Sequence, residues 1–594
     1  MVLDSLLQAL VLLSVSLPLF VMVQFVDTAP RLHSAEDSST TLEDDIRKSN
    51  SVPYPDPRPG TQNGIEYPNS TVRQESDAQR NWIPKDEERH GRTLVLCFDG
   101  TGDQFDESNS NIVELVAMLR KDDRHKQLVY YQPGIGTHGT PFSSSRFLAG
   151  VYKTLDQMLA FTLESHIRAE YLFLMENHTV GDKVCLFGFS RGAYTARALA
   201  GMIQKVGLLS RGNAEQLPFA FDMYLREDHT GLHLSKMFKE AFSKDVKIDF
   251  LGVWDTVASV GLRTPRLPFV RTNNGIRCFR HALSLDEHRT KFMPFFYKKA
   301  PSKTEPQPPA TQGNGLPPQI SNLSTVRKEI LRPEDYDPLS EATKDEQLQN
   351  EKETTRTDCQ EVFFAGSHCD VGGGSVKNGT RHSLARIPLR WMVRECFRAK
   401  TGLIFDADLL LRRAGLDMAS NLPPRLSPGP SDSLQVISKQ PSPCPSNCSA
   451  AITSPVKSEW TKLPEEVEEL NDALSPIYDQ LELRRVWWIL EMTPIRHLVQ
   501  KPIKYANDPP KMKTKGFANK GQGRIILRHV INSNGGGELH IHRSVKTRLE
   551  ALDGNGQKET YVPRIQPDFE GSGGPSSLRH QEWMKEKRIV WVDE

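Results

Sequence analysis

The chain has 594 residues, of which 38% are hydrophobic and 25% charged, and 40 are prolines. This length exceeds one ordinary domain, but the low apolar content indicates one sizeable folded unit joined to long unpacked stretches. Lys and Arg (75) balance Asp and Glu (74), which argues against a nucleic-acid-binding surface. Eight cysteines are too few for a disulfide scaffold. The close pair Cys444 and Cys448 lacks further ligands at a zinc spacing. We therefore predict no metal and no cofactor.

The first segment of the chain is apolar. Residues 5–26, which lie between Asp4 and Asp27, contain no charged side chain. A stretch of about 20 apolar residues is long enough to cross a bilayer. We therefore favour a membrane anchor and assign residues 1–26 to an apolar anchor or signal segment. A cleaved signal peptide would normally start with a basic region, which is missing here; that alternative, a misread start and a buried helix stay open. The expected location is membrane-associated, with the secretory pathway as one option.

Three further segments have the composition of chain that cannot bury a core. Residues 27–90 are rich in Ser, Asp, Glu, Pro and Asn, and predict a disordered stalk. Two inserts, 300–357 and 420–463, are rich in Pro with Gln, Glu and Lys or with Ser, and are longer than structured loops. The remaining parts are predicted to form one domain, made of residues 91–299, 358–419 and 464–594.

The folded part begins at Arg92–Phe98, an apolar run typical of a buried strand. Further strands are expected at 128–131, 183–189, 246–254 and 361–365, and helices at 112–119, 153–173, 193–206 and 383–400. Buried strands that alternate with helices indicate an α/β fold with a mostly parallel sheet flanked by helices. The stretch Arg280–His288 instead has helical character.

The sharpest motif follows the strand at 183–189. Gly188-Phe-Ser190-Arg-Gly192 fits the G-x-S-x-G pattern, with a strand before it and a helix-forming run after it. A serine on such a tight turn projects its hydroxyl from the sheet, and the small flanking residues let the backbone turn. The alternative is a glycine-bounded turn whose serine only caps the helix. We predict that Ser190 is a nucleophile.

A nucleophilic serine needs a base, and the base needs an orienting carboxylate. In this class of fold the order along the chain is Ser, acid, His. Asp255 ends a predicted strand and is the candidate acid; the alternative is an Asp that caps a turn through Thr256. His368 follows another strand, enters a glycine-rich loop and is the candidate base. His281 and His288 compete for this role, but their helical surroundings favour His368.

The negative oxygen of an acyl-transfer intermediate must be met by backbone N–H groups. We expect one from Arg191 and others from Gly100 and Thr101, which follow the first strand. Asp99 in the same loop is unexplained, because its carboxylate would repel a developing oxyanion. Its expected partners are Thr101 or the loop 136–137.

Another interpretation starts from Phe98-Asp-Gly-Thr101, which resembles the D-x-D-G-T loop of aspartyl-phosphate phosphatases. Cys97 occupies the position of the nucleophilic carboxylate, and a buried thiol cannot replace the group that also binds magnesium. We set this interpretation aside. No phosphate-binding glycine loop supports nucleotide binding either.

Four motifs together resemble one family, namely Cys97–Gly102, Gly188–Ala193, Val253–Val257 and Gly366–Gly374. It is the α/β-hydrolase-like domain of uncharacterised fungal and bacterial proteins that includes the type VI secretion phospholipase effectors. The resemblance covers residues 92–410 and is weaker to about 550. It implies an α/β-hydrolase fold, with Ser190, Asp255 and His368 on the triad positions, and, for the effector branch of the family, lipid esters as substrates.

Two functions follow as hypotheses. The first is a membrane-associated serine esterase, phospholipase A-like, that cleaves lipid or other carboxylic esters through an acyl-enzyme. Residues 5–26 would hold it beside its substrate, without a nucleic-acid partner. The second is a catalytically idle hydrolase fold that acts as an interaction platform through its Pro-rich inserts.

Overall fold

The computed structural model describes residues 82–84, 91–100, 103, 105–134, 150–226, 229–257, 267–298, 356–417, 463–484, 487–492, 495–500, 512–517, 519–526, 538–551, 561–567 and 586–593. The predicted apolar segment 5–26 lies outside these residues, as do nearly all of the two predicted inserts. The elements described below belong to one unit, Asn81–Phe142 with Asp156–Glu594, apart from the first residues of one helix.

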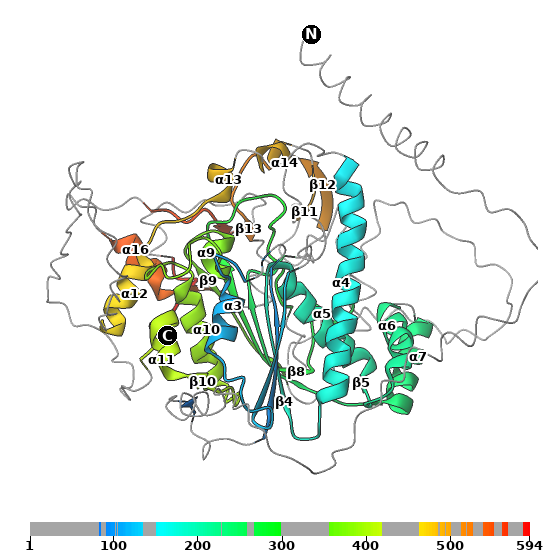
Figure 1. Ribbon diagram of the computed structural model, residues 1–594. Coiled ribbons are helices and arrows are strands. Elements are labelled where there is room, and N and C mark those ends of the chain that lie inside the picture. The colour runs from blue at the N-terminus through cyan, green and yellow to red at the C-terminus, as the bar shows by residue number, and fades with distance from the viewer. Residues whose placement is uncertain are drawn as a thin grey trace, which may run out of the picture. The chain divides into compact units, whose positions relative to one another are not determined.

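A parallel sheet of eight strands forms the centre of this unit (Figure 1). Its strand order is β16-β14-β9-β8-β7-β4-β2-β3, and every neighbouring pair is parallel. The strands are β2 (Thr93–Phe98), β3 (Gln127–Gln132), β4 (Lys183–Phe189), β7 (Ile248–Trp254), β8 (Ile276–Ser284), β9 (Asp358–Phe364), β14 (Leu539–His542) and β16 (Ile589–Val592). The predicted parallel α/β fold is confirmed.

Helices cover both faces of the sheet (Figure 1). The longer ones are α3 (Asn111–Met118), α4 (Gly150–Asn177), α5 (Ser190–Val206), α6 (Leu217–Leu225), α7 (His229–Phe242), α10 (Arg386–Arg398), α12 (Glu465–Ala473) and α16 (Arg543–Glu550). Side chains of β2 alternate between the two cores: Leu94 and Leu96 pack with α4 and α5, whereas Val95 and Cys97 pack with α3 and α10. Because both faces are buried, the strands read as continuous apolar runs.

Shorter elements complete the described part. They are β1 (Trp82–Ile83), β5 (Leu208–Leu209), β6 (Ser243–Lys244), β10 (Phe405–Asp406), β11 (Ile495–Gln500), β12 (Met512–Phe517), β13 (Ile525–Ile526), β15 (Gln566–Pro567), α9 (His368–Gly372), α11 (Ala407–Leu409), α13 (Gln480–Leu483), α14 (Trp488–Met492), the 3-10 turn Ala214–Gln216 and the π turn Leu410–Ala414. Strand β1 lies within the predicted stalk and pairs with β10, so ordered chain starts before residue 90.

The helical character expected for Arg280–His288 is wrong. This stretch is the second half of β8 and the loop after it, and β8 pairs with β7 on one side and β9 on the other. Apolar residues Phe279, Ala282 and Leu283 are spaced as on a helix, and all are buried. A central strand has no exposed face and therefore lacks the alternation that identifies a strand.

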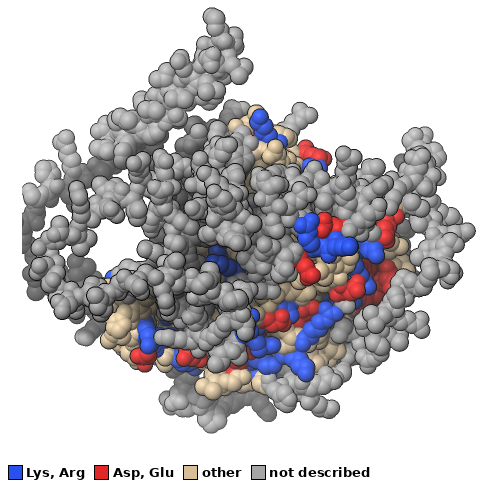
Figure 2. All heavy atoms as spheres, turned by 180° about the vertical axis from the view of Figure 1, so that it is seen from behind, with Lys and Arg blue, Asp and Glu red and all other residues tan. Residues whose placement is uncertain are grey.

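Two surface properties bear on the partner predictions. Within the described residues, no helix is both long and apolar enough to span a bilayer. On the described part of the face in Figure 2, Lys and Arg side chains lie interspersed with Asp and Glu, as expected for a net charge of +1.

Candidate active site

Ser190 lies on a strained turn between β4 and α5. Its φ is +58°, in the left-handed region that side chains rarely adopt. The tight turn is possible because Gly188 and Gly192, two residues before and after Ser190, have no side chain. A Cβ on Gly188 would lie 2.6 Å from the Cα of Ala193, and one on Gly192 would lie 2.4 Å from the carbonyl oxygens of Phe98 and Asp99. The turn therefore presses α5 against the end of β2.

The three side chains predicted for a nucleophile, base and acid form one hydrogen-bonded chain. His368 Nε2 lies 2.8 Å from Ser190 Oγ, and His368 Nδ1 lies 2.6 Å from Asp255 Oδ2. Asp255 and Ser190 follow the neighbouring strands β7 and β4, and His368 follows β9. Parallel strands bring these carboxyl ends to one edge of the sheet, where ligand and catalytic sites of open α/β sheets lie.

His368 begins the short helix α9, and Ser367 N before it donates to Asp370 Oδ2 at 2.9 Å. Its imidazole lies between the rings of Phe189 and Phe292, with centroid distances of 4.7 and 4.8 Å. Burial lowers the pKa of His368, and the Asp255 carboxylate opposes part of that shift. The ring is therefore neutral near pH 7, with Nδ1–H donating to Asp255 and Nε2 accepting from the serine hydroxyl.

Asp255 is fully buried, and its carboxylate is held by more than the histidine. Ser284 N donates to Oδ1 at 3.0 Å, and Arg524 donates to both oxygens at 2.7 and 2.8 Å. Burial alone would raise the pKa of Asp255, but the Arg524 guanidinium and the His368 hydrogen bond hold it well below its usual range. Sequence reasoning missed Arg524, which no motif marks.

Asp99, in the loop after β2, has one partner from β3 and one from its own loop, neither of which was predicted. Tyr131 Oη donates to its Oδ2 at 2.8 Å, and Gly100 N donates to its Oδ1 at 2.9 Å. The N–H of Gly100, one of the expected oxyanion donors, therefore already has an acceptor. Thr101 and the loop 136–137 lie outside the described residues. Arg191 N lies in the first turn of α5, where helix amides favour negative charge.

The competing histidines have structural partners. His281 Nδ1 lies 2.8 Å from Glu361 Oε1, and its Nε2 accepts from Thr256 N at 3.0 Å. His288 contacts Gly521 O and Asp479 Oδ2 at 2.8 and 2.7 Å. Of the three histidines, the structure brings His368 to Ser190.

The thiol considered for a phosphatase-like site lies in the core. Cys97 is fully buried, and burial followed by the nearby Asp99 raises its pKa far above the ordinary thiol value. A neutral thiol facing apolar side chains cannot bind magnesium.

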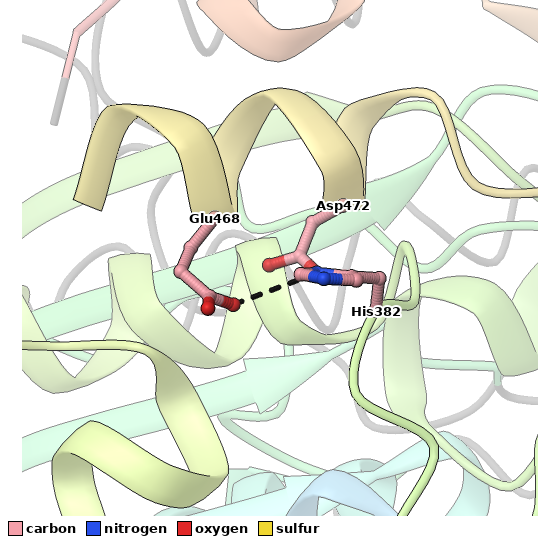
Figure 3. Close-up of side chains that lie close together, drawn as sticks. All are labelled: His382, Glu468 and Asp472. Carbon is pink, nitrogen blue, oxygen red and sulfur yellow. Dashed lines mark ion pairs between the residues drawn. The ribbon is translucent and has the colours of Figure 1, made fainter. Parts of the chain in front are cut away.

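One group outside this site has the residue types of a metal site. His382, Glu468 and Asp472 lie close together at α12 (Figure 3). However, the carboxylate oxygens already pair with arginines, namely Arg381, Arg386 and Arg390, at 2.7–3.1 Å. Three guanidinium groups outweigh two carboxylates and would repel a cation. The group is an ion-pair network that fastens α12 to α10.

A family model and a related protein match this chain. The family model described as "T6SS, Phospholipase effector Tle1-like, catalytic domain" matches residues 92–395, just over half of the chain. An uncharacterized protein of Saccharomyces cerevisiae is 29% identical over 590 residues, covering 83% of this chain and 84% of that protein.

Two solved structures are similar over part of their length. A crystal structure of an uncharacterized protein from Pseudomonas aeruginosa has 19% identity and a TM-score of 0.28, covering 56% of this chain and 48% of that one. The Tle1 effector bound to the VgrG spike of the type 6 secretion system has 19% identity and a TM-score of 0.20, covering 34% and 47%. The chain thus spans about half the length of these two. By its match over residues 92–395, the chain belongs to the Tle1-like phospholipase effector catalytic-domain family of type VI secretion.

Proposed function

We propose that this protein is a serine hydrolase that cleaves carboxylic esters, with Ser190 as nucleophile, His368 as base and Asp255 as the orienting acid. The observation that carries the proposal is the hydrogen-bonded chain from Ser190 through His368 to Asp255. Its position on a strained turn at the carboxyl end of β4 supports the same role.

The geometry supports acyl transfer in two steps. Ser190 Oγ attacks the ester carbonyl carbon while its proton passes to His368 Nε2, and Asp255 stabilises the imidazolium that forms. The amide of Arg191 stabilises the negative oxygen. His368 then gives its proton to the leaving alcohol, which leaves an acyl group on the serine. Water, deprotonated by the same histidine, hydrolyses this acyl-enzyme.

The substrate class that we propose is lipid esters, with phospholipase A-type cleavage as the specific form. Membership of a phospholipase effector family supports it. The helices α13 and α14 lie at the same end of the molecule as α9 (Figure 1), and they expose Leu483, Trp488 and Met492 by 61, 41 and 58%. Exposed apolar side chains near such a site favour a lipid over a polar substrate.

Labelling of the full-length protein with a fluorophosphonate tests the nucleophile. Ser190→Ala should abolish labelling and lower hydrolysis of a short p-nitrophenyl ester by about 10⁶-fold. The exposed Ser210 provides the control, since Ser210→Ala should change neither. Wild-type protein that neither labels nor cleaves esters or phospholipid vesicles would instead favour the idle interaction platform.

We also propose that residues 5–26 hold the protein at a membrane, on the strength of their uncharged, apolar sequence. Full-length protein should then stay in the membrane fraction through an alkaline carbonate wash. Release by carbonate would contradict a membrane-spanning segment, and the lipid-ester proposal would then rest on the family match and on the exposed apolar side chains of α13 and α14.

A further inference from the structure

Arg524 contacts the candidate acid although it lies far outside the family match. The arginine immediately precedes β13, and both it and Asp255 have fully buried side chains. Nη1 contacts Asp255 Oδ1 at 2.7 Å and Nη2 contacts Oδ2 at 2.8 Å. This is the two-pronged geometry that gives an arginine–carboxylate pair its strength and its fixed orientation.

Other partners fix the guanidinium itself. Nη1 also donates to Ser284 Oγ at 2.7 Å and to Ser284 O at 3.2 Å, and Nη2 donates to the carbonyl oxygen of Phe292. Ser284 in turn donates its N–H to Asp255, and the Phe292 ring packs against His368. Arg524 thus joins the acid to the two segments that surround the base.

Several contacts hold residues 519–526, the segment that contains Arg524, in place. Asn519 Nδ2 donates to His288 O at 2.8 Å, and β13 pairs with β15. A Cβ on Gly523 would lie 1.7 Å from Arg564 O, so only glycine permits this close approach of the two backbones. The position of Arg524 therefore follows from contacts made by the C-terminal part of the chain.

Resting on the proposed hydrolase function, we propose that Arg524 is a positioning residue: its guanidinium keeps Asp255 ionised and oriented toward His368, so that the C-terminal region completes the active site. A buried carboxylate without a counter-charge is costly. The arginine supplies that charge while leaving Oδ2 able to accept from the imidazole.

A second effect follows from charge. The charged groups around His368 are Asp255, Glu287 and Arg289, with Arg524 behind Asp255. Arg524 and His368 both bind the Asp255 carboxylate, and the positive charge of Arg524 offsets part of its negative charge. The carboxylate therefore stabilises the imidazolium of His368 less than it would without Arg524. Removal of Arg524 should let the Asp255–His368 pair take up a proton at a higher pH, and hydrolysis, which needs the ionised acid and the neutral base, should then begin at a higher pH.

Two substitutions in the full-length protein test this role with a water-soluble p-nitrophenyl ester. In R524M, kcat should fall on the order of 10–100-fold, by analogy with the loss when a partner that orients a metal-ligating residue is removed, with KM little changed. The acid midpoint of the kcat/KM profile should move up by on the order of one pH unit. R524K keeps the positive charge but cannot make both hydrogen bonds to the carboxylate, so its kcat and pH midpoint should lie between those of R524M and the wild type.

Arg390 provides a matched control, because it is also fully buried and paired with an aspartate, Asp472, outside the site. R390M should lower the melting temperature without moving the pH midpoint. The proposal is overturned if R524M keeps the wild-type kcat and midpoint, or, should R524M not fold, if R524K does so. If the wild-type protein shows no Ser190-dependent labelling, the hydrolase function fails first and the role of Arg524 falls with it.

Discussion

Two regions of the chain build the same sheet in different ways. Residues 92–395 supply six of its strands and the chain of Ser190, His368 and Asp255. Residues 463–593 add β14 and the edge strand β16, and β14 meets β9 through one register pair, Ile541 with Phe363. The second region therefore depends more on side-chain contacts than on strand pairing, and one of these contacts reaches the candidate acid.

The comparison shows that a region with little share in the sheet can still contact the candidate acid. The family match ends at residue 395, yet the carboxylate of Asp255 is buried together with an arginine from position 524. The measurements that follow, in order of expected effect, test whether the two regions divide the work in this way.

The largest effect is expected in the first region. Asp255→Asn should lower kcat by about 10⁴-fold, as in a serine protease triad, because the amide no longer favours the Nδ1–H form of His368. Ester hydrolysis by purified protein measures it. Asp249, at the other end of β7 and paired with Arg277 at 2.8 Å, is the control. Comparable losses in Asp249→Asn and Asp255→Asn would contradict a specific role.

A change in the second region should affect stability rather than chemistry. Asp472 is fully buried and pairs with Arg386 and Arg390. Asp472→Asn leaves these guanidinium groups short of a counter-charge and should cost about 3–5 kcal/mol in the free energy of unfolding, measured with denaturant. The exposed Glu466 on the same helix is the control, since Glu466→Gln should change it by less than about 0.5 kcal/mol. A wild-type value in Asp472→Asn would mean that the region is held by other contacts.

The pH dependence of ester hydrolysis distinguishes two histidines. His368 contacts Ser190 and Asp255 of the first region, whereas His288 contacts Asp479 and Gly521 of the second. Burial lowers the pKa of His368, whereas Asp479 and the Gly521 carbonyl outweigh burial and raise that of His288. A base must be neutral, so kcat/KM should rise tenfold per pH unit on the acid side and level off at a midpoint below about 6.5. Circular dichroism at each pH controls for unfolding. A midpoint above 6.5 would instead indicate control by a group such as His288.

The smallest effect is expected from the predicted insert. Replacing residues 303–355 by a brief Gly/Ser linker should leave the melting temperature and ester hydrolysis nearly unchanged, because its composition cannot bury apolar surface. Loop-closure entropy changes by only about 0.6 kcal/mol per doubling of length. A fall in melting temperature of more than a few degrees would show that the insert packs on the domain.

Local signals explain which parts of the molecule could be predicted. The turn at Ser190 follows directly from a strand, a five-residue motif and a helix, so the sequence contains all of it within one stretch. Strand β8 was misassigned because its central place in the sheet hides the alternation of a strand. Helices α6 and α7 were not predicted, although both pack near α5.

Arg524 could not be predicted for a different reason. It lies 269 residues from Asp255 along the chain, and a single arginine carries no motif. Contacts made after the chain folds bring it to the site, among them the pairing of β13 with β15 and the hydrogen bond from Asn519 to His288 O. Tyr131 could not be predicted as the partner of Asp99 either, because no motif marks it. Its hydroxyl donates a hydrogen bond to the buried Asp99 carboxylate.

The place of β14 in the sheet has a consequence for how the protein is made. Strand β9 ends at residue 364 and its outer neighbour begins at residue 539, so at about 5–20 residues per second the ribosome needs roughly 10–35 s to supply the missing partner. During that interval β9 is an open edge, which invites pairing with other chains. Its first half carries Asp358, Gln360 and Glu361, and polar residues at an edge discourage such pairing. During synthesis the part of this edge open to unwanted pairing is thus its apolar second half, around Phe363, until β14 pairs with it.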